Sequence, residues 1–182
     1  MQKIIYTILF SFLLLNSSAQ WEEDVKDLTK KERTLFGASA GISFSQFGMY
    51  FMGAPSVGYR LSNNILGGVG VKYIYNSFNN GSVAYKQHVY GGSVFAQHNL
   101  VSPRFFLHGE LEMLNWEARD RFTYNISRRW VPMGFVGAGF RNFYSERSFY
   151  QIILLYDLID DPYSPYPYMW NMPLTLRLGI VF

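Results

Sequence analysis

The chain has 182 residues, which is enough for one domain of ordinary size. Charged residues make up 16% of it and aromatic residues 19%, whereas a soluble globular domain usually has charges at about a quarter of its positions. The net charge of +3 comes with basic residues dispersed along the chain, which excludes a concentrated nucleic-acid-binding patch. The chain has no cysteine, which excludes both a disulfide framework and a thiol nucleophile.

The beginning of the chain has the layout of a secretory signal peptide. Lys3 supplies a short basic region, residues 4–15 are mostly apolar, and Ser17-Ser18-Ala19 is a small-residue cleavage site before Gln20. The apolar run has about 12 residues, whereas a helix needs about 20 to cross a bilayer. We therefore predict that residues 1–19 direct export and are then removed.

Residues 20–33 are predicted to form a charged N-terminal tail on the periplasmic side. Acidic and basic side chains alternate there without an apolar run. Two interpretations stay open, a short helix or a solvated segment without a partner, and the charge pattern favours the second.

Residues 34–182 contain eight segments in which apolar residues alternate with small or polar ones. A period of two is typical of β-strands with two unlike faces. The last segment is the clearest, because one parity is wholly apolar and the other carries Thr175, Arg177 and Gly179. The predicted strands are residues 34–44, 54–62, 65–78, 83–99, 104–116, 130–141, 148–157 and 173–182.

The faces of two of these strands are not decided by the pattern. In the fourth, Tyr90, Gly92, Val94 and Ala96 are the favoured outer set, but the opposite parity stays open. The sixth is rich in glycine and equally ambiguous in register.

The links between the predicted strands tend to alternate in length. Residues 62–64, 100–103 and 142–147 are short turns, whereas the other links are predicted to be longer: residues 45–53, 118–129 and 158–172. The fourth link on that side, residues 79–82, is the exception, because its Asn-Gly pair favours a tight hairpin. Short turns on one side and long loops on the other are typical of outer-membrane barrels.

The alternation also indicates the solvent around the sheet. Large apolar residues on one parity and small or polar ones on the other suit strands that face lipid outside and a lumen inside. In lipid every backbone group must be paired internally, so the sheet has to close. We predict an all-β fold, an eight-stranded antiparallel up-and-down transmembrane β-barrel with a filled or narrow lumen. Its predicted location is the outer membrane of a Gram-negative bacterium, reached by export through the periplasm.

Residues 34–182 resemble the small eight-stranded outer-membrane β-barrel proteins of the OmpA/OmpX-like type. The resemblance rests on the alternating strands, the loop asymmetry and the C-terminal strand that ends in Phe182. In that group such a strand is recognised by the barrel-assembly machinery, so the resemblance implies an assembly signal at Leu174, Leu176, Leu178, Ile180 and Phe182. The group includes structural, adhesive, defensive and enzymatic proteins, so the resemblance implies no particular activity.

The parity predicted to face the lumen carries several ionisable residues. An ionisable group within a membrane is costly unless it is paired, so we expect an interior charge network. The favoured interpretation is a structural plug of salt bridges, and the alternative is a proton or ion path or a binding site. The residues are Arg60, Lys72, His108, Glu110, Glu112 and Arg177.

Function is more often carried by loops on a rigid scaffold. Basic residues in 118–129 are candidates for contact with lipopolysaccharide phosphates or with a protein partner. Aromatic residues in 158–172 favour interfaces, although a stiff loop that binds nothing specific is slightly favoured over recognition. The candidate loop residues are Arg119, Arg121, Arg128, Arg129, Tyr163, Tyr166, Tyr168 and Trp170.

Two further classes of function stay open. One is a lipid-modifying enzyme built around His88, similar to the lipid A palmitoyltransferase and deacylase barrels, although His88 has no His-x-Ser arrangement and no clear acidic partner. The other is a secreted soluble barrel that binds an apolar ligand as lipocalins do, in which case the apolar parity points inward.

The favoured prediction is a non-enzymatic protein with an envelope-structural or surface-recognition role. No metal or cofactor is predicted, because His88, His98 and His108 lack metal-binding spacings. The expected partners are outer-membrane lipid, lipopolysaccharide and the assembly machinery. The pattern does not determine the ligand, pore activity or oligomeric state.

Overall fold

Eight antiparallel strands close into a barrel in which each strand pairs with its neighbours in sequence and β8 pairs with β1. The computed structural model describes residues 24–45, 48–79, 84–100, 102–119, 126–166 and 171–182. The predicted fold class, an all-β up-and-down barrel of eight strands, is confirmed. The strands are β1 (Thr34–Ser45), β2 (Gly48–Arg60), β3 (Ile65–Asn79), β4 (Ala84–Asn99), β5 (Phe105–Arg119), β6 (Ile126–Phe143), β7 (Phe149–Asp157) and β8 (Leu174–Val181).

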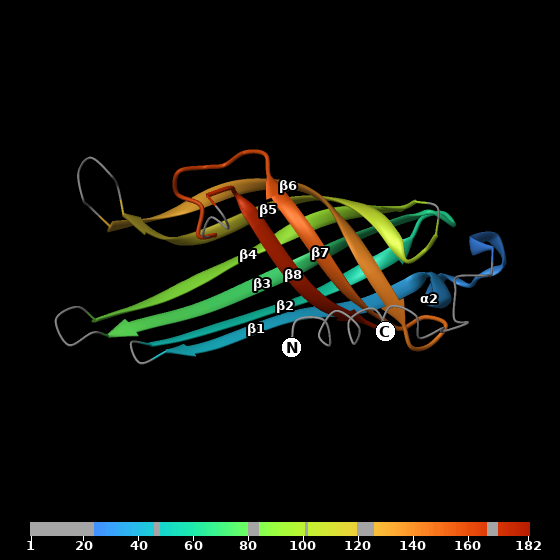
Figure 1. Ribbon diagram of the computed structural model, residues 1–182, viewed down its shortest axis with the longest axis horizontal. Coiled ribbons are helices and arrows are strands. Elements are labelled where there is room, and N and C mark those ends of the chain that lie inside the picture. Colours follow the sequence, from blue (N-terminus) through green and yellow to red (C-terminus); the bar gives the residue numbers. More distant parts are fainter. Residues whose placement is uncertain (1–23, 46–47, 80–83, 101, 120–125, 167–170) are drawn as a thin grey trace, which may run out of the picture.

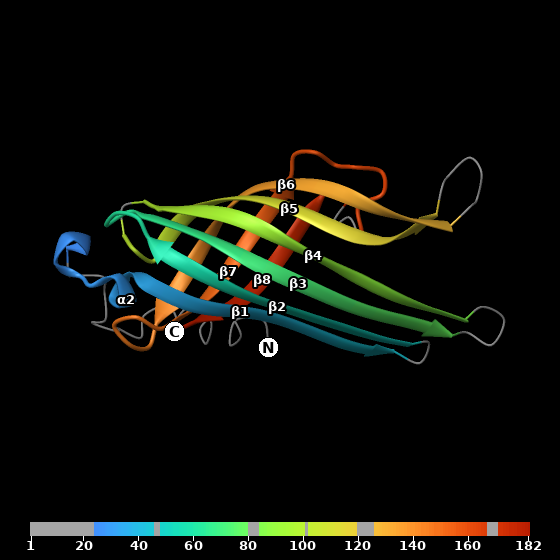
Figure 2. The ribbon, with the colours of Figure 1, turned by 180° about the vertical axis from the view of Figure 1, so that it is seen from behind.

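The two ends of the barrel differ, as Figure 1 and Figure 2 show from opposite sides. One end carries two short N-terminal helices, and we call it the helical end. The other is formed by the β1–β2, β3–β4 and β5–β6 hairpins, and we call it the hairpin end. Strand β6 has 18 residues, whereas β7 and β8 have 9 and 8. The first six strands therefore extend past β7 and β8 toward the hairpin end.

Two predicted loops are largely strand in the structure. Strand β2 begins at Gly48, so the long loop expected at 45–53 is wrong. Residues 49–52 are all apolar or aromatic, so a period of two is invisible there. Strand β5 continues to Arg119 and β6 begins at Ile126, which also shortens the loop expected at 118–129. The link from β7 to β8 remains long.

A belt of apolar side chains covers the outside of the barrel. Leu111 and Val71, near the middle of their strands, are 64% and 62% exposed. The apolar parity of the last strand also faces outward, since Leu176 and Leu178 are more than half exposed. Other exposed members of the belt are Val57, Val69, Val94, Leu107, Val136, Ile152 and Leu154.

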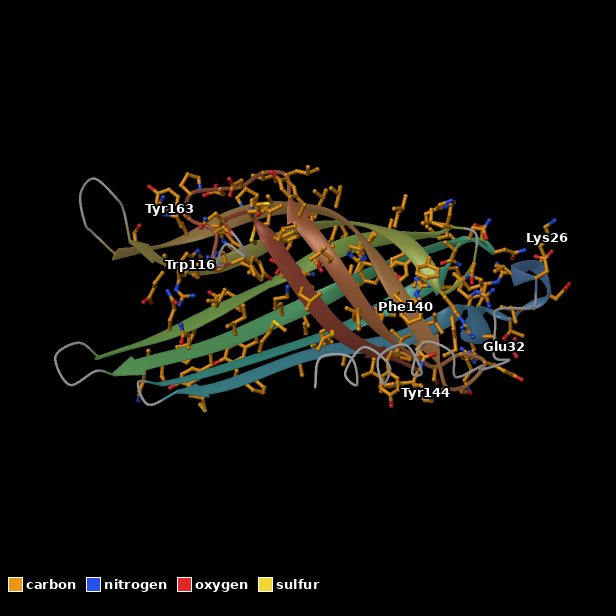
Figure 3. All side chains as sticks on the ribbon, viewed as in Figure 1. Lys26, Glu32, Trp116, Phe140, Tyr144 and Tyr163 are labelled. Carbon is orange, nitrogen blue, oxygen red and sulfur yellow. The ribbon has the colours of Figure 1, made fainter. Side chains whose placement is uncertain are left out.

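Aromatic side chains border this belt at both ends. Toward the hairpin end, the rings of Tyr90 and Trp130 meet edge to face with centroids 6.2 Å apart. Toward the helical end, Phe105 contacts Phe140, and Tyr144 lies in the same region (Figure 3). Amphipathic rings at both margins of an apolar band are typical of membrane barrels.

The structure decides the two ambiguous registers. In β4, Tyr90 and Val94 face outward, as the favoured parity predicted. In β6, Trp130 is exposed, whereas Met133 and Phe135 are completely buried in the lumen.

Apolar side chains fill the lumen in two clusters. The first lies at the helical end and joins strands far apart in sequence: Leu35, Leu66, Phe143, Phe149 and Val181. Most of the second lies farther toward the hairpin end: Ile74, Val89, Phe106, Leu114, Met133, Phe135, Ile153 and Leu155. Polar and charged side chains occupy the lumen between them.

Residues 24–33 form the 3-10 helix η1 (Val25–Asp27) and the α-helix α2 (Lys30–Arg33). Val25 is buried, and its backbone N–H donates to Asn63 Oδ1 at 2.8 Å in the β2–β3 turn. Arg147 in the β6–β7 turn donates to the carbonyl oxygens of Lys31 and Thr34. This part of the tail thus contacts the barrel, contrary to the favoured interpretation of a solvated segment. Within the described residues, no helix is long and apolar enough to span a membrane.

Candidate functional site

Three strands bring buried charges to one level of the lumen. Lys72 lies in β3, Glu110 and Glu112 in β5, and Arg177 in β8. Residues two positions apart on a strand lie on the same face, so the carboxylates of Glu110 and Glu112 both point inward. The Lys72 and Glu112 side chains are 6% and 0% exposed. These four side chains are the centre of what we call the lumen network.

The ion pairs of this network share partners with one another. Lys72 Nζ lies 2.7 Å from Glu112 Oε1, and Arg177 Nη2 lies 2.8 Å from Glu112 Oε2. The other terminal nitrogen of Arg177 donates to Glu110 Oε2. Two cations thus face two carboxylates, and each oxygen of Glu112 has its own charged partner. Such pairing offsets the cost of removing the charges from water.

Tyr166, from the long β7–β8 link, completes the network. Its hydroxyl accepts a hydrogen bond from Lys72 Nζ at 2.6 Å and donates one to Glu112 Oε1 at 2.9 Å. Its ring packs edge to face on Phe135. Trp116 Nε1 donates to the carbonyl oxygen of Tyr163, which holds the link against β5. The link therefore folds into the barrel and places Tyr166 over the ion pairs.

His108 extends the network toward the helical end. Its Nε2 lies 3.2 Å from Glu110 Oε2, and its Nδ1 lies 3.0 Å from Gln97 Nε2. An amide nitrogen only donates, so Nδ1 is the acceptor and Nε2 carries the proton shared with Glu110. The imidazole also stacks on Phe95. Both ring nitrogens are thus engaged in holding neighbouring groups.

Arg141 in β6 is a buried lumen residue that the sequence pattern did not reveal. It is completely buried and donates to Asn99 Oδ1 at 2.9 Å and to Gln97 Oε1. Its guanidinium also lies 4.0 Å from the centroid of the Phe106 ring, within cation–π range. The ambiguous register of the sixth predicted strand concealed it. The available signal was its charge, because an arginine within a membrane strand has to face the lumen.

Arg60 is buried as well, but it lies away from this group. Its partner across the β2–β3 ladder is Leu66. Leu66 precedes Lys72 by six residues on β3, which is about 20 Å along a strand. The structure therefore brings together five of the six predicted network residues and places the sixth at the helical end.

A cavity of about 70 Å³ adjoins the network. Away from the network, much of the cavity wall consists of residues with small side chains or none. These residues are Ser39, Ala54, Ser56, Gly70, Ser93 and Gly179. Pockets for organic ligands usually have about 300 Å³ or more, so this cavity suits water and small ions. Gln151 Oε1 lines it and has no hydrogen-bond partner among the described residues, as expected for an acceptor that binds water.

The predicted loop residues have several different locations. Arg119, Arg128 and Arg129 lie on strands. Arg128 donates to Asn115 Oδ1 at 2.9 Å and to the carbonyl oxygen of His88 at 3.2 Å. The β4–β5 ladder ends toward the hairpin end at the pair of Tyr90 with Asn115. Arg128 connects the two strands just past this last pair. Arg128 thus hydrogen-bonds two neighbouring strands of the barrel.

Among the predicted aromatic loop residues, Tyr166 lies against the lumen: its hydroxyl bonds Glu112, and its partly buried ring packs on Phe135. Tyr163 lies on the same link and packs 4.0 Å beneath the Arg129 guanidinium. Arg121, Tyr168 and Trp170 lie outside the described residues.

His88 is exposed on the outer face near the hairpin-end aromatic residues. Its Nδ1 lies 2.8 Å from the Tyr73 hydroxyl, and its ring packs near Tyr75. Nucleophilic catalysis needs a base held by a third group beside a nucleophile. Among the described residues, the ring of His88 contacts tyrosines rather than such a set. Nor does the described part of the chain hold a group of three or more His, Asp or Glu side chains placed to bind a metal.

Comparisons with known proteins give a likeness in structure alone. No family model matches the chain, and no curated protein matches it. Among solved structures, the chain is similar to the N-terminal β-barrel domain of Pseudomonas aeruginosa OprF, with a TM-score of 0.43 and 13% sequence identity. The match covers 82% of this chain and 96% of that one.

Proposed function

We propose that this chain is an outer-membrane β-barrel protein with a filled lumen, which serves the cell envelope as a structural or surface-recognition protein and catalyses no reaction. The observation that carries the proposal is the reversed distribution of its side chains. Charged residues such as Glu112 and Arg141 are buried, while large apolar ones such as Leu111 and Val71 are exposed.

The outer surface of the barrel is too apolar for a soluble protein. Soluble monomers seldom expose contiguous apolar patches larger than a few hundred square ångströms. Here the exposed apolar residues occur on every strand and encircle the barrel. A lipid environment explains this surface, because a membrane barrel presents such an apolar band to lipid between two aromatic margins.

The lipocalin-like alternative requires the opposite arrangement. In that case Leu176 and Leu178 face inward around an apolar ligand. They are instead exposed on the outside, and the lumen holds ion pairs and a cavity of about 70 Å³. An apolar ligand of ordinary size has no place there.

The filled lumen is evidence that the barrel has no diffusion pore. Eight strands leave space that side chains can fill, and here they do so with two apolar clusters and the lumen network between them. Tyr166 adds a plug from the β7–β8 link. Function is then left to the surface and to the links between the strands.

The proposed function also assigns roles to the two ends of the chain and to its basic residues. Residues 1–19 act as the signal peptide, and the tail then lies in the periplasm. The outward face of β8, from Leu174 to Phe182, acts as the assembly signal. Arg119, Arg121, Arg128 and Arg129 contact lipopolysaccharide. Of these, Arg128 and Arg129 lie among the first residues of β6, toward the hairpin end.

Fractionation of cells that express the full-length chain tests this function. We expect recovery in the outer membrane and a gel mobility that changes on boiling, since a closed barrel resists detergent until heated. A variant without residues 174–182 is the control, because its barrel cannot close. A soluble periplasmic product with unchanged mobility contradicts the proposal.

A further inference from the structure

Strands β4 and β5 diverge toward the hairpin end, and Arg128 lies where they separate. Beyond the level of Tyr90 and Asn115, where their ladder ends, Figure 1 and Figure 2 both show β3 and β4 apart from β5 and β6. Arg128 belongs to β6 and reaches across β5 to the carbonyl oxygen of His88 on β4. Its guanidinium also lies 5.1 Å from the centroid of the Tyr90 ring. Arg128 is therefore held in place on the outer wall of the barrel.

The guanidinium of Arg128 can accept a further partner. Within the described residues it donates to Asn115, His88 and Glu117, and a guanidinium carries more N–H donors than these contacts use. The Glu117 contact is long, at 3.4 Å, and the Arg128 and Glu117 side chains are 33% and 48% exposed. Such a surface pair is weak, so a stronger anion can replace Glu117. Because Arg128 is already oriented, it loses little freedom when an anion binds.

Two basic side chains on β4 lie beside it. Lys86, His88 and Tyr90 are all exposed and share the outward face of the strand. Nδ1 of His88 lies 2.8 Å from the Tyr73 hydroxyl, which orients the ring, and Nε2 has no partner among the residues that the structure describes. Lys86 is about 7 Å farther along the strand, a distance that its own long side chain can span. We call Lys86, His88 and Arg128 the outer basic site.

The outer basic site lies just beyond the aromatic margin of the apolar belt. His88 and Arg128 each follow a margin residue, Tyr90 and Trp130, by two positions toward the hairpin end. Tyrosine and tryptophan rings of membrane proteins lie at the level of the lipid headgroups. Two residues advance a strand by at most about 7 Å, and the headgroup layer is about 5–7 Å thick on each side of the hydrocarbon. The basic groups therefore lie at the depth of lipid phosphates.

We propose that the outer basic site binds a phosphate group of lipopolysaccharide. The inference rests on the proposed outer-membrane function, which places the hairpin end in the outer leaflet, opposite the N-terminal tail. Lipid A, the embedded part of lipopolysaccharide, carries phosphates at the top of its acyl chains, and those chains would lie along the apolar belt. Guanidinium and ammonium groups form strong charge-assisted hydrogen bonds with phosphate. Arg129 is not part of this site, because Tyr163 packs against its guanidinium.

Native mass spectrometry of the full-length chain, folded in neutral detergent micelles, tests the site with lipid A as the probe. The double substitution Lys86→Gln and Arg128→Gln should weaken lipid A binding by roughly tenfold or more, because charge-assisted hydrogen bonds are lost. Lys86→Gln with His88→Gln keeps the Arg128 contacts between the strands and should still weaken binding severalfold. Lipid A without its phosphates should bind the wild-type chain as weakly as phosphorylated lipid A binds the first variant.

The matched control is Lys30→Gln with Lys31→Gln, which removes two exposed charges at the helical end and should leave binding unchanged. Heat-modifiable mobility reports closure of each barrel, and the Lys86 and His88 variant decides if the Arg128 variant does not close. Equal binding of that variant and the wild type, or of lipid A with and without phosphates, overturns the site. Inorganic phosphate that fully displaces lipid A overturns the lipid as occupant. Recovery in the outer membrane with any of these results leaves the proposed function intact, whereas a soluble product overturns both.

Discussion

Lys72 Nζ and Glu112 Oε1 lie 2.7 Å apart inside the barrel, with side chains that are 6% and 0% exposed. They come from β3 and β5, which are separated by β4. The pair therefore ties together strands that share no ladder. Arg177 on β8 joins the same carboxylate and extends the tie across the lumen.

Removal of the Glu112 charge should destabilise the barrel strongly. Glu112→Gln leaves Lys72 and Arg177 as buried cations with one carboxylate, and breaking a buried pair costs about 3–5 kcal/mol. Urea titration of the folded barrel in lipid vesicles, followed by gel mobility, measures the free energy of unfolding. Glu117→Gln is the control, because its pair with Arg128 is exposed and such pairs contribute about 0–1 kcal/mol. Equal effects of the two substitutions contradict the role assigned to the lumen network.

Tyr166 should control whether the lumen conducts ions. Tyr166→Ala removes the ring that covers the ion pairs, so we expect ion conductance in planar bilayers where the wild-type chain shows little. Tyr166→Phe keeps the ring and loses the hydrogen bonds to Lys72 and Glu112, so we expect a closed barrel that is less stable by about 1–3 kcal/mol. Conductance that is unchanged in Tyr166→Ala shows that other side chains close the lumen.

A charge on the outer belt distinguishes lipid from water as the surroundings. Leu111→Arg places a cation near the middle of the belt, where lipid-facing arginine costs about 2–4 kcal/mol. Phe105→Arg, at the margin of the belt, should cost about 0–1 kcal/mol. Folding free energies measured in vesicles check the difference. In a soluble barrel neither substitution removes a buried contact, so similar small effects at both sites would argue against membrane insertion.

Two glycines on adjacent strands should respond differently to alanine. A Cβ added at Gly137 lies 2.0 Å from the Leu154 carbonyl oxygen, so Gly137→Ala forces backbone movement and should cost about 1–3 kcal/mol. A Cβ added at Gly109 meets nothing within 4 Å. Gly109→Ala should therefore be neutral or stabilise the barrel by about 0.4–1 kcal/mol through reduced entropy of the unfolded chain. Chemical unfolding of both variants tests this order.

The helix α2 should loosen in acid. Hydrogen bonds from the Thr29 hydroxyl and backbone N–H hold the pKa of Glu32 below its usual value. A lowered pKa means that the folded segment favours the charged carboxylate. Its stabilising effect is complete above the ordinary glutamate pKa and is lost as the pH falls through the lowered value. Hydrogen exchange at the Thr29 amide should accelerate relative to neighbouring amides over that range. A Glu32→Gln variant with the same pH response would assign the change to another group.

Much of the barrel wall was predictable from residue order. A period of two is a local property, so Leu176 and Leu178 on one parity and Arg177 on the other already separate lipid from lumen. The same rule assigned Lys72, Glu110 and Glu112 to the inside. It failed at residues 49–52, where both parities are apolar, and at Arg141, where glycine-rich flanks conceal the parity.

The partners of these side chains were decided by the tertiary structure. The alternation of residues determined the strands, their number and most of their faces, because each depends on neighbours one or two positions away. That Tyr166 bonds Lys72, 94 residues earlier in the chain, depends on how the described part of the β7–β8 link, up to Tyr166, folds back into the lumen. The short ladder between β1 and β8, from Gly37 to Ser39, likewise follows from the course of β8 away from β1. Such contacts join residues distant in sequence, and no local period encodes the geometry that brings them together.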